Sequence, residues 1–371
     1  MYDVLIAGGG LAGLVNAIQL AKSGLQVVLV EKKQYPFHKV CGEYISNEVL
    51  PFLHSMGIYP QQLGASTITH LQVSSPSGKS VLNTALDLGG FGLSRYVLDN
   101  YLYKMALEAG TLFLLGKSVE KISFTEDSFD VELSDGNVLN SKLVIGAFGK
   151  RSRLDKQLNR AFINERSPYI GVKYHIRTHF PKDLIALHNF KDGYCGVCAI
   201  EDNTFNMCYL TSRTNLKQYG SIEEMESHTL YKNPFLKEIK QDAEFLYDKP
   251  EVINEISFAP KKAVENHMLM SGDAAGLITP LCGNGMAMAI HSAKILSELI
   301  IQYFTQHHNR NQLEYVYARQ WQQLFARRLW AGRQIQQLFG SEWLSGMAVS
   351  FLQHVTPATR FLMKQTHGKV F

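Results

Sequence analysis

Residues 3–21 read DVLIAGGGLAGLVNAIQLA, and this stretch decides the fold. Asp3 to Ala7 is a nearly continuous apolar run of β-strand length. The run breaks into a glycine-rich segment, Gly8 to Gly13, and resumes at Leu14 with apolar residues at helical spacing. The stretch therefore predicts a strand, a tight turn and a helix.

Three glycines of this turn have the G-x-G-x-x-G spacing of a phosphate-binding loop. Gly8 permits the turn, Gly10 lets the backbone approach a pyrophosphate, and Gly13 lets the helix press against the strand. The N–H groups and the positive dipole end of the helix then face the phosphates. A second strand at 26–30 ends in Glu31, whose carboxylate can accept hydrogen bonds from both hydroxyls of an adenosine ribose. We expect a dinucleotide site; the alternative is a glycine-rich turn without a ligand.

The composition sets the class of protein. The chain has 371 residues, which is long for one domain and favours two interleaved lobes. Its formal net charge is +4, from 37 basic and 33 acidic residues, which argues against a nucleic-acid binder. The longest apolar stretch, 286–304, contains His291, Lys294 and Glu298, so we expect an amphipathic or buried helix and not a membrane span.

The cysteines indicate a reducing compartment. Their number is odd, and residue 1 leads directly into a strand without a signal peptide, so we expect free thiols and a cytoplasmic location. Cys195 and Cys198 form a C-x-x-C pair in a predicted strand, whose alternation turns their side chains to opposite faces. We therefore expect neither a redox pair nor a metal site there. The five cysteines are Cys41, Cys195, Cys198, Cys208 and Cys282.

The segment from Lys32 to Tyr44 carries Pro and Gly and has no sustained period, so we expect a loop. It leaves the carboxyl edge of the sheet, where ligands of open α/β sheets bind, and Cys41 and Glu43 are expected to face the ligand. The alternative is that Cys41 is a small buried hydrophobe and Glu43 a solvated acid.

A helix is predicted to begin after Ser94, its N-cap, and to end at Gly110. Arg95 stands in its first turn, where a cation is unfavourable for the helix dipole. We therefore expect an anionic or hydrogen-bonding partner for Arg95 outside the helix; the alternative is a surface arginine.

Apolar alternation and turn residues predict the remaining strands. Residues 66–93 are expected to alternate between strands and turns, 221–240 to be helical with a break at Asn233-Pro234, and 252–257 to form a strand. Other strands are expected at 119–124, 129–133, 138–143 and 143–149, and the last of these is expected to return to the first sheet. A second, antiparallel sheet is expected from strands at 171–176, 184–190, 194–200 and 205–211.

Residues 268–290 read MLMSGDAAGLITPLCGNGMAMAI and predict a second strand, glycine loop and helix. Asp273 can hold a sugar or ribityl hydroxyl, and the N–H groups of Gly285, Met286 and Ala287 can stabilise negative charge on a ring system. Two glycine-bearing helix N-termini indicate a ligand with two anionic regions, as a flavin dinucleotide has. The alternative is an ordinary connection without a ligand.

The C-terminal part carries aromatic and basic residues at helical spacing. Such a stripe is expected to pack in a core, although a basic aromatic helix could contact an anionic membrane surface. The stripe comprises Tyr317, Trp321, Phe325, Arg328, Trp330, Arg333 and Phe339.

Together these motifs, which span roughly residues 1–300, resemble the flavin-dependent oxidoreductases of the p-hydroxybenzoate hydroxylase-like superfamily. The first glycine turn with Glu31 is similar to its ADP site, and Arg95 with Asp99 to its R-x-x-x-D helix, whose arginine lies near the cofactor. The segment 146–149 with Ser152 is similar to G-A-D-G-x-x-S, with Phe148 in place of the acid. The G-D-A-A…P…G-x-G signature of the ribityl chain and flavin ring is matched by Gly272, Asp273, Ala274, Ala275, Pro280, Gly283 and Gly285.

Within the superfamily, the chain resembles the geranylgeranyl reductase branch. Cys41-Gly42-Glu43 is similar to the C-G-[DE] loop of that branch. Of its aromatic-x-Trp-x-Phe-Pro element only Tyr194 is present, and the halogenase W-x-W-x-I-P signature is absent from the sequence.

The resemblance implies an α/β fold in which an FAD-binding Rossmann-like domain (1–66, 94–165 and 258–305) is interleaved with an antiparallel substrate sheet (67–93 and 166–257), followed by C-terminal helices (306–371). It implies Cys41 and Tyr194 as catalytic residues and no metal. The implied FAD-binding residues are Gly8, Gly10, Ala12, Gly13, Glu31, Lys32, Cys41, Gly42, Arg95, Val119, Gly149, Gly272, Asp273, Pro280, Gly283, Gly285, Met286 and Ala287.

The leading hypothesis is that FAD, reduced by transiently bound NADH or NADPH, delivers hydride to a carbon–carbon double bond of a hydrophobic substrate. That substrate is expected to be an isoprenoid, an acyl chain or an aromatic polyketide. One alternative is a monooxygenase that hydroxylates an aromatic or polyketide ring. Another is a non-catalytic flavin-binding protein.

Overall fold

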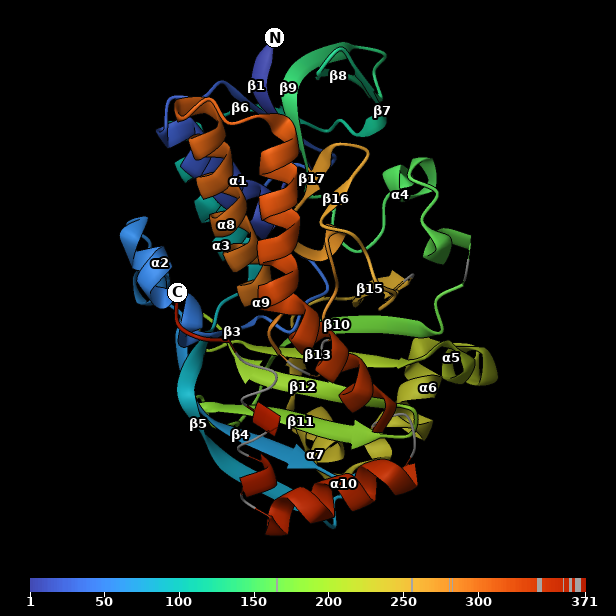
Figure 1. Ribbon diagram of the computed structural model, residues 1–371. Coiled ribbons are helices and arrows are strands. Elements are labelled where there is room, and N and C mark those ends of the chain that lie inside the picture. The colour runs from blue at the N-terminus through green and yellow to red at the C-terminus, as the bar shows by residue number, and fades with distance from the viewer. Residues whose placement is uncertain are drawn as a thin grey trace.

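The computed structural model describes residues 1–164, 166–254, 256–279, 281, 283–338, 342–355, 357–359, 362–363 and 368–371. Figure 1 shows one β-sheet with its helices at the top and a second sheet below it. The long helix α9 (Arg310–Leu338) runs from the upper part toward the second sheet. The predicted α/β class with two sheets and C-terminal helices is confirmed.

The first sheet is built around the opening strand, which pairs in parallel with a strand on either side. Residues 138–146 form one strand, where the sequence predicted two, because the meander strand continues without a break into the parallel sheet. The sheet order is β16 (Val264–Glu265), β17 (Met268–Met270), β9 (Val138–Gly146), β1 (Tyr2–Ala7), β2 (Val27–Glu31) and β6 (Leu112–Leu115), and β7 (Val119–Thr125) and β8 (Ser128–Leu133) extend it antiparallel from β9.

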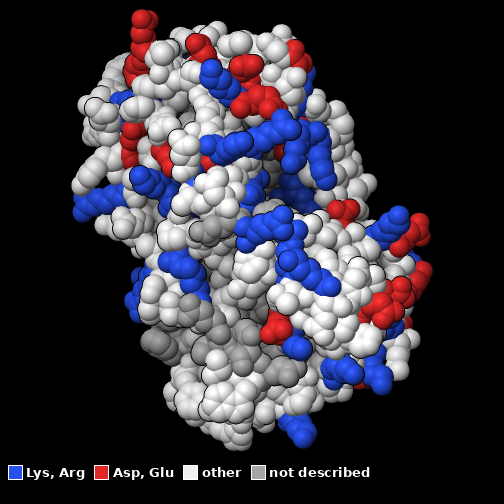
Figure 2. All heavy atoms as spheres, turned by 90° about the vertical axis from the view of Figure 1, so that its right-hand side faces the viewer, with Lys and Arg blue, Asp and Glu red and all other residues white. Residues whose placement is uncertain are grey.

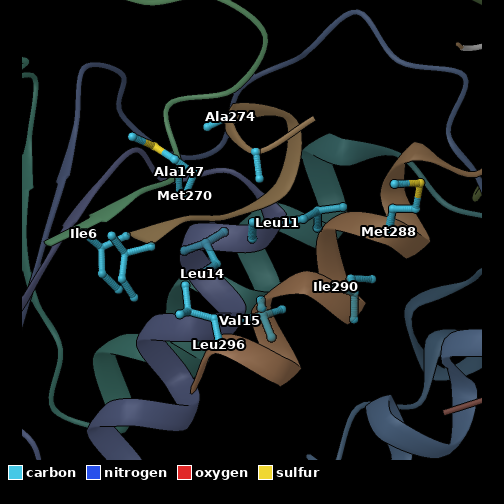
Figure 3. Close-up of a cluster of buried hydrophobic side chains, with 14 of the residues drawn as sticks. Ile6, Leu11, Leu14, Val15, Ala147, Met270, Ala274, Met288, Ile290 and Leu296 are labelled. Atoms are coloured by element: carbon cyan, nitrogen blue, oxygen red, sulfur yellow. The ribbon is translucent and has the colours of Figure 1, made fainter. Parts of the chain in front are cut away.

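The core of this half lies between the sheet and helix α1 (Leu11–Lys22), which is buried on nearly all sides. α1 packs against α3 (Arg95–Glu108) and α8 (Gly285–Thr305), which is why its sequence is apolar almost all round. Figure 3 shows Leu14 and Val15 of α1 beside Ile290 and Leu296 of α8. Each such fully buried side chain contributes about 1.5–3 kcal/mol.

The four strands predicted at 171–176, 184–190, 194–200 and 205–211 pair antiparallel, as expected. The sheet as a whole is nevertheless mixed, which corrects the prediction for the segment 67–93. β11 pairs in parallel with β4, because β4 comes from an earlier part of the chain and no hairpin turn fixes their relative direction. Tyr44–Ser46 also joins this sheet, although the segment was expected in the FAD-binding domain. The order is β14 (Glu244–Phe245), β10 (Tyr169–Arg177), β13 (Phe205–Ser212), β12 (Gly193–Ala199), β11 (Leu184–Phe190), β4 (Ser66–Ser74), β5 (Val81–Gly92) and β3 (Tyr44–Ser46), with β15 (Glu251–Asn254) on β10.

One face of the second sheet packs against helices, and its buried cluster includes Met225, Leu230 and Leu236. The predicted break at Asn233-Pro234 is confirmed, since Asn233 caps a helix that Pro234 begins. The helices here are α5 (Arg213–Tyr219), α6 (Ile222–His228) and α7 (Pro234–Asp242); elsewhere lie α2 (Leu50–Ser55), α4 (Arg153–Gln157) and α10 (Glu342–His354). Short 3-10 helices span Asn47–Val49, Pro60–Leu63, Ala161–Asn164, Leu230–Lys232 and Gly272–Ala274.

The predicted aromatic stripe lies on α9. Tyr317, Trp321 and Phe325 are buried, which confirms core packing, whereas Trp330 is exposed and Phe339 lies outside the described residues. Among the helices that the structure describes, none is long and apolar enough to cross a membrane. The three-part domain division stays a prediction.

Candidate functional site

A cavity of about 1260 Å³ lies where the carboxyl edge of the first sheet meets the second sheet. Gly13 and Ala287 are buried outside its lining, and Pro280 lies outside the described residues. The other predicted site residues line it: Gly8, Gly10, Ala12, Glu31, Lys32, Cys41, Gly42, Arg95, Val119, Gly149, Tyr194, Gly272, Asp273, Gly283, Gly285 and Met286. The structure thus brings these residues to one cavity, while their roles stay predictions.

The turn after β1 requires its glycines. Gly8 has φ +110°, and a Cβ at Gly13 would lie 2.0 Å from the carbonyl oxygen of Gly8. A Cβ at Gly10 would instead meet only the Arg95 Nη2 at 3.8 Å and the Lys39 Nζ at 3.9 Å. Two cations therefore face the start of α1, where backbone N–H groups also attract an anion. These residues fit a dinucleotide diphosphate.

Glu31 ends β2 at the cavity, as the sequence predicts for a ribose acceptor. Its carboxylate accepts hydrogen bonds from the backbone N–H groups of Gly9 at 2.8 Å and Lys33 at 3.1 Å. An ionised carboxylate has about four lone-pair positions, so it keeps acceptor capacity for a ligand hydroxyl. Tyr35, which the sequence reasoning missed, donates its O–H to the Gly9 carbonyl at 2.5 Å and fixes the same turn.

Arg95 forms its ion pair inside its own helix, so the expectation of a partner outside the helix is wrong for its side chain. Its Nε and Nη2 donate to Asp99, one turn along α3, at 2.7 and 2.8 Å. Lys39 donates to the same carboxylate at 2.9 Å. Burial alone would raise the pKa of Asp99, but Arg95 and Lys39 hold it below its ordinary value. Two cations share one anion, which leaves net positive charge beside Gly10.

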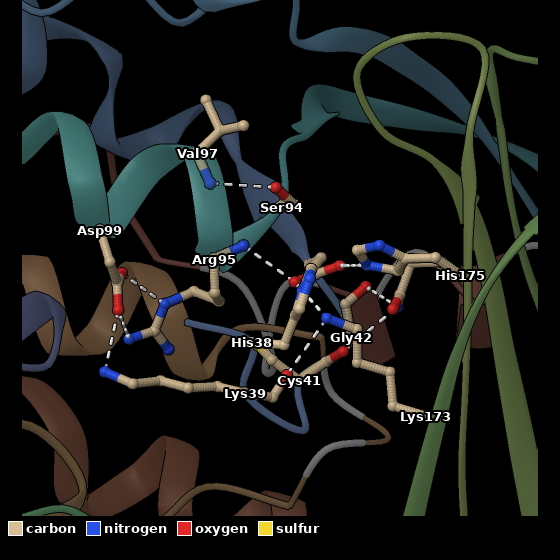
Figure 4. Close-up of polar contacts among 12 residues, drawn as sticks. His38, Lys39, Cys41, Gly42, Ser94, Arg95, Val97, Asp99, Lys173 and His175 are labelled. Atoms are coloured by element: carbon tan, nitrogen blue, oxygen red, sulfur yellow. Dashed lines mark hydrogen bonds and ion pairs between the residues drawn. The ribbon is translucent and has the colours of Figure 1, made fainter. Parts of the chain in front are cut away.

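Glu43 is fully buried, so the alternative of a solvated acid is wrong. Its carboxylate accepts from the Arg95 backbone N–H at 2.8 Å, from Lys173 Nζ at 2.5 Å and from His175 Nε2 at 2.6 Å (Figure 4). Burial alone would raise the pKa of Glu43, but the Lys173 charge and the His175 hydrogen bond hold it below its ordinary value. The carboxylate therefore joins the first helix turn of α3 to strand β10.

The loop before Glu43 is bonded to the second sheet through its carbonyl groups. Lys173 donates to the Lys39 carbonyl at 3.2 Å, and Asn206 Nδ2 donates to the carbonyls of Cys41 at 3.2 Å and Gly42 at 2.9 Å. Cys41 is partly buried: it lines the cavity, and it also packs against the hydrophobic core. The loop is held in one position over the end of the sheet (Figure 4).

The second glycine segment meets the first one. A Cβ at Gly272 would lie 2.9 Å from the Cβ of Ala12, and Asn16 of α1 donates to the Ser271 hydroxyl at 3.2 Å. Gly285 begins α8 at the cavity, as predicted, and Asp273 lies in the turn after β17. The N-termini of α1 and α8 therefore open into the same cavity.

The end of the cavity described so far is the glycine-lined end, with Gly8, Gly10, Gly272 and Gly285. The end that lies against the second sheet is the apolar end. Tyr194 is buried on β12 and lines the cavity. The apolar lining of this end includes Leu71, Val73, Leu82, Leu86, Ile185, Leu187, Val197 and Leu210.

Basic residues gather at the glycine-lined end of the cavity. Figure 2, which faces the side of α4 and β15, shows Lys and Arg side chains gathered around a hollow. The basic residues that line the cavity there include Lys32, Lys33, Lys117, Lys150, Arg151 and Arg153.

Within the described part of the chain, His, Cys, Asp and Glu form no group that could hold a metal ion. Cys195 and Cys198 lie in separate buried clusters, which confirms that they face apart.

Comparison with known proteins identifies the family. The family model described as the FAD binding domain matches residues 1–322. The chain belongs to this FAD-binding family. The flavoprotein is 25% identical over 345 residues to the conditioned medium factor receptor 1 of Dictyostelium discoideum, covering 82% of this chain but only 64% of that protein.

Two further relatives are reductases or reductase-like. The flavoprotein is 23% identical over 308 residues to the digeranylgeranylglycerophospholipid reductase of Methanococcus vannielii, covering 80% of this chain and 76% of that protein. Its fold is similar to that of a geranylgeranyl bacteriochlorophyll reductase-like protein of Thermoplasma acidophilum, with a TM-score of 0.79 and 19% sequence identity. The similarity covers 98% of this chain and 95% of that protein. The flavoprotein is an FAD-dependent oxidoreductase of the p-hydroxybenzoate hydroxylase-like superfamily.

Proposed function

We propose that this flavoprotein reduces a carbon–carbon double bond in a long apolar substrate of isoprenoid type. The observation that carries the proposal is the apolar wall of the cavity on the second sheet, which continues from the glycine-lined end without a break in the cavity. Apolar side chains from β4, β5, β11 and β12 can bury a hydrocarbon chain, which gains about 0.8 kcal/mol for each CH₂ group.

The relatives support the same substrate class. One of them is named a digeranylgeranylglycerophospholipid reductase, and such a lipid carries long unsaturated isoprenoid chains. The C-G-E loop, on which the resemblance to that branch depends, lies between the two ends of the cavity.

The residues at the glycine-lined end would hold FAD, which when bound supplies hydride transfer. The start of α1 with Arg95 and Lys39 would bind the diphosphate, and Glu31 the adenosine ribose. Asp273 would accept from the ribityl chain. The N–H groups at the start of α8, from Gly285 onward, would face the polar edge of the ring and stabilise negative charge there.

Cys41 and Tyr194 are the proposed residues at the substrate. Both line the cavity, Cys41 on the loop between its two ends and Tyr194 on the wall of the second sheet. Each carries a proton on sulfur or oxygen, and double-bond reduction adds one hydride and one proton to the two carbons. We propose that one of them shapes the pocket and that the other handles this proton.

The electron donor is proposed to be NADH or NADPH, bound transiently. The basic residues around the hollow of Figure 2 can attract its phosphates from solution. A nicotinamide ring brought to the cavity there would reach the same end as the flavin.

The test is an oxygen-free reoxidation. FAD-loaded protein is reduced with NADPH, with NADH or with dithionite, and a phospholipid with geranylgeranyl chains is added. The expected result is return of the oxidised flavin absorbance, with two hydrogens gained for each double bond in the mass spectrum of the lipid. Failure of the lipid to reoxidise the protein, together with oxygen uptake coupled to a phenolic compound, would contradict the proposal and identify a monooxygenase.

A further inference from the structure

Three ring-bearing side chains form a hydrogen-bonded chain beside Glu43. Tyr247 Oη lies 2.6 Å from His175 Nδ1, and 3.0 and 3.2 Å from the two ring nitrogens of His38. His175 Nε2 in turn lies 2.6 Å from Glu43. His38 comes from the loop after β2 and His175 from β10, and Figure 4 shows them close together across the loop.

The hydrogen-bond donors and acceptors that each side chain carries fix the direction of these bonds. An ionised Glu43 can only accept, so His175 carries a hydrogen on Nε2. In neutral His175 the Nδ1 atom is then bare and accepts the Tyr247 O–H. The Tyr247 oxygen is left to accept from an N–H of His38. The chain therefore runs from His38 through Tyr247 and His175 to Glu43.

A second state uses the same atoms. When His175 also carries a proton on Nδ1, it donates to the Tyr247 oxygen, and the Tyr247 O–H turns to donate to His38. In the first state the extra proton is on His38. Its N–H proton passes to the Tyr247 oxygen as the Tyr247 O–H proton passes to His175 Nδ1, so that His38 becomes neutral and His175 becomes the cation. The positive charge on His175 then lies on the ring whose Nε2 is 2.6 Å from the Glu43 carboxylate.

We propose that His38, Tyr247 and His175 form a proton wire that leads away from the cavity wall, in which His38 exchanges a proton with the cavity and His175 stores it beside Glu43. The proposal rests on the proposed function, because reduction of a double bond consumes one proton from solvent for each hydride. The proton enters and leaves the wire at His38, because Glu43 and Lys173 at the other end are fully buried, and no electrons move through it.

Burial supports the assignment of the two ends. His38 is partly exposed and lines the cavity, whereas His175 is 6% exposed and Glu43 and Lys173 are fully buried. Burial and the charges of Lys173 and His175 lower the pKa of His38 to about 4, so a proton does not rest there. Burial and the charge of Glu43 raise the pKa of Tyr247, so the hydroxyl passes a proton without ionising.

The charged groups that face the wire come from several elements. Glu43 lies on the loop, Lys173 on β10, Glu201 after β12 and Glu251 on β15. Their charges stay fixed while a proton moves between the imidazoles, so a variant that breaks the wire without changing these charges is the cleanest test.

The variant Tyr247→Phe removes one oxygen and keeps both imidazoles. FAD-loaded protein is reduced with dithionite in a stopped-flow instrument, and a pH dye follows the proton uptake that accompanies flavin reduction, in H₂O and in D₂O. The expected result is uptake slowed roughly 10-fold or more, with the solvent isotope effect changed. The matched control is Tyr231→Phe, which removes a hydroxyl bonded to Glu226 at 3.3 Å on the helix-covered face. Uptake by Tyr247→Phe at the wild-type rate would overturn the wire.

A second measurement needs no cofactor. Imidazole carbon–proton NMR signals of His38 and His175 in the FAD-free protein are followed against pH, with thermal melting to check that the variants fold. In the wild type a proton taken up at His38 is expected to shift the signals of both rings together, and in Tyr247→Phe the His38 signals are expected to shift alone. Joint shifts of the two rings in the variant would count against the wire.

The two proposals can fail separately. If no lipid is reduced but Tyr247→Phe still slows proton uptake, the substrate assignment is wrong and the wire stands. If the lipid is reduced and Tyr247→Phe takes up protons like the wild type, the wire is wrong and the proposed function stands.

Discussion

The two ends of the cavity are built under different constraints. At the glycine-lined end a Cβ on Gly13 would lie 2.0 Å from a backbone oxygen, and one on Gly272 would lie 2.9 Å from Ala12. At the apolar end a Cβ on Gly196 would meet Leu187 at 3.6 Å, an ordinary contact. A fixed dinucleotide requires exact backbone positions, whereas a hydrocarbon chain requires only apolar volume. Substitutions at the two ends should therefore separate cofactor binding from substrate turnover.

The largest expected effect is at Gly13. In Gly13→Val the new side chain enters the space of the Gly8 carbonyl, so α1 must move away from β1. We expect the purified protein to lose bound FAD and to melt at a lower temperature, measured by the flavin-to-protein absorbance ratio and by calorimetry. Gly346→Ala is the control, since a Cβ there meets nothing within 4 Å. FAD retention by Gly13→Val would show that the turn tolerates a side chain.

Glu43 lies between the two ends, and Glu43→Gln should reduce stability next most. The change leaves the buried Lys173 charge without its carboxylate, which costs about 3–5 kcal/mol of unfolding free energy. The control is Glu120→Gln, which breaks the exposed pair with Arg153 and is expected to leave the urea midpoint unchanged.

The Glu43→Gln variant also tests how the stability depends on pH. Because the folded protein holds the pKa of Glu43 below its ordinary 4.5, the stabilisation is complete above that value. It is lost as the pH falls through the lower folded pKa. The difference in unfolding free energy between wild type and Glu43→Gln should therefore shrink as urea titrations move from neutral pH to below 4.5. A difference that stays constant would show that the ionised carboxylate is not the source of the stabilisation.

A bulky side chain on the apolar wall should lower substrate turnover and leave FAD binding unchanged. Leu187→Trp fills part of the cavity on β11, and kcat/KM for a geranylgeranyl lipid should fall roughly 10-fold or more while FAD affinity is unchanged. Leu187→Met, of similar volume, is the control and should retain most of the activity. Loss of FAD from Leu187→Trp would mean that the two ends are not separable.

The smallest expected effect concerns Lys261, which donates to the backbone carbonyls of Lys150 and Asp273 at 2.8 and 2.9 Å. Burial lowers the pKa of Lys261 from 10.5 to about 8, so above that pH the folded protein binds fewer protons than the unfolded chain. Stability should then rise with pH above about 8, by at most about 1 kcal/mol for each pH unit. Lys261→Met should lack this rise in urea titrations; a rise of the same size in the variant would assign it to another group.

The sequence predicts the glycine-lined end well because its signals are local. The strand, turn and helix around Gly8 to Gly13 lie within one short stretch, and the start of α8 follows from Gly285 in the same way. That the two turns touch, through Gly272 and Ala12, depends on a chain reversal that no local pattern encodes.

The rest of the site depends on residues far apart along the chain. Lys173, His175 and Asn206 hold the C-G-E loop, but they lie at least 130 positions away from it on β10 and β13. Polar residues at alternate positions of the otherwise buried strand β10 are the one signal that could have found Lys173 and His175. Arg95 was assigned an outside partner because the dipole argument overlooked Asp99, which lies one turn further along.

A crystal structure of the protein with FAD tests the central claim most directly. The account predicts one extended FAD molecule with its diphosphate at Gly10 and Arg95, its ring at the start of α8, and the free side of the ring toward the apolar wall. A structure in which either helix end makes no contact with the cofactor, or in which the ring faces away from the second sheet, would contradict it.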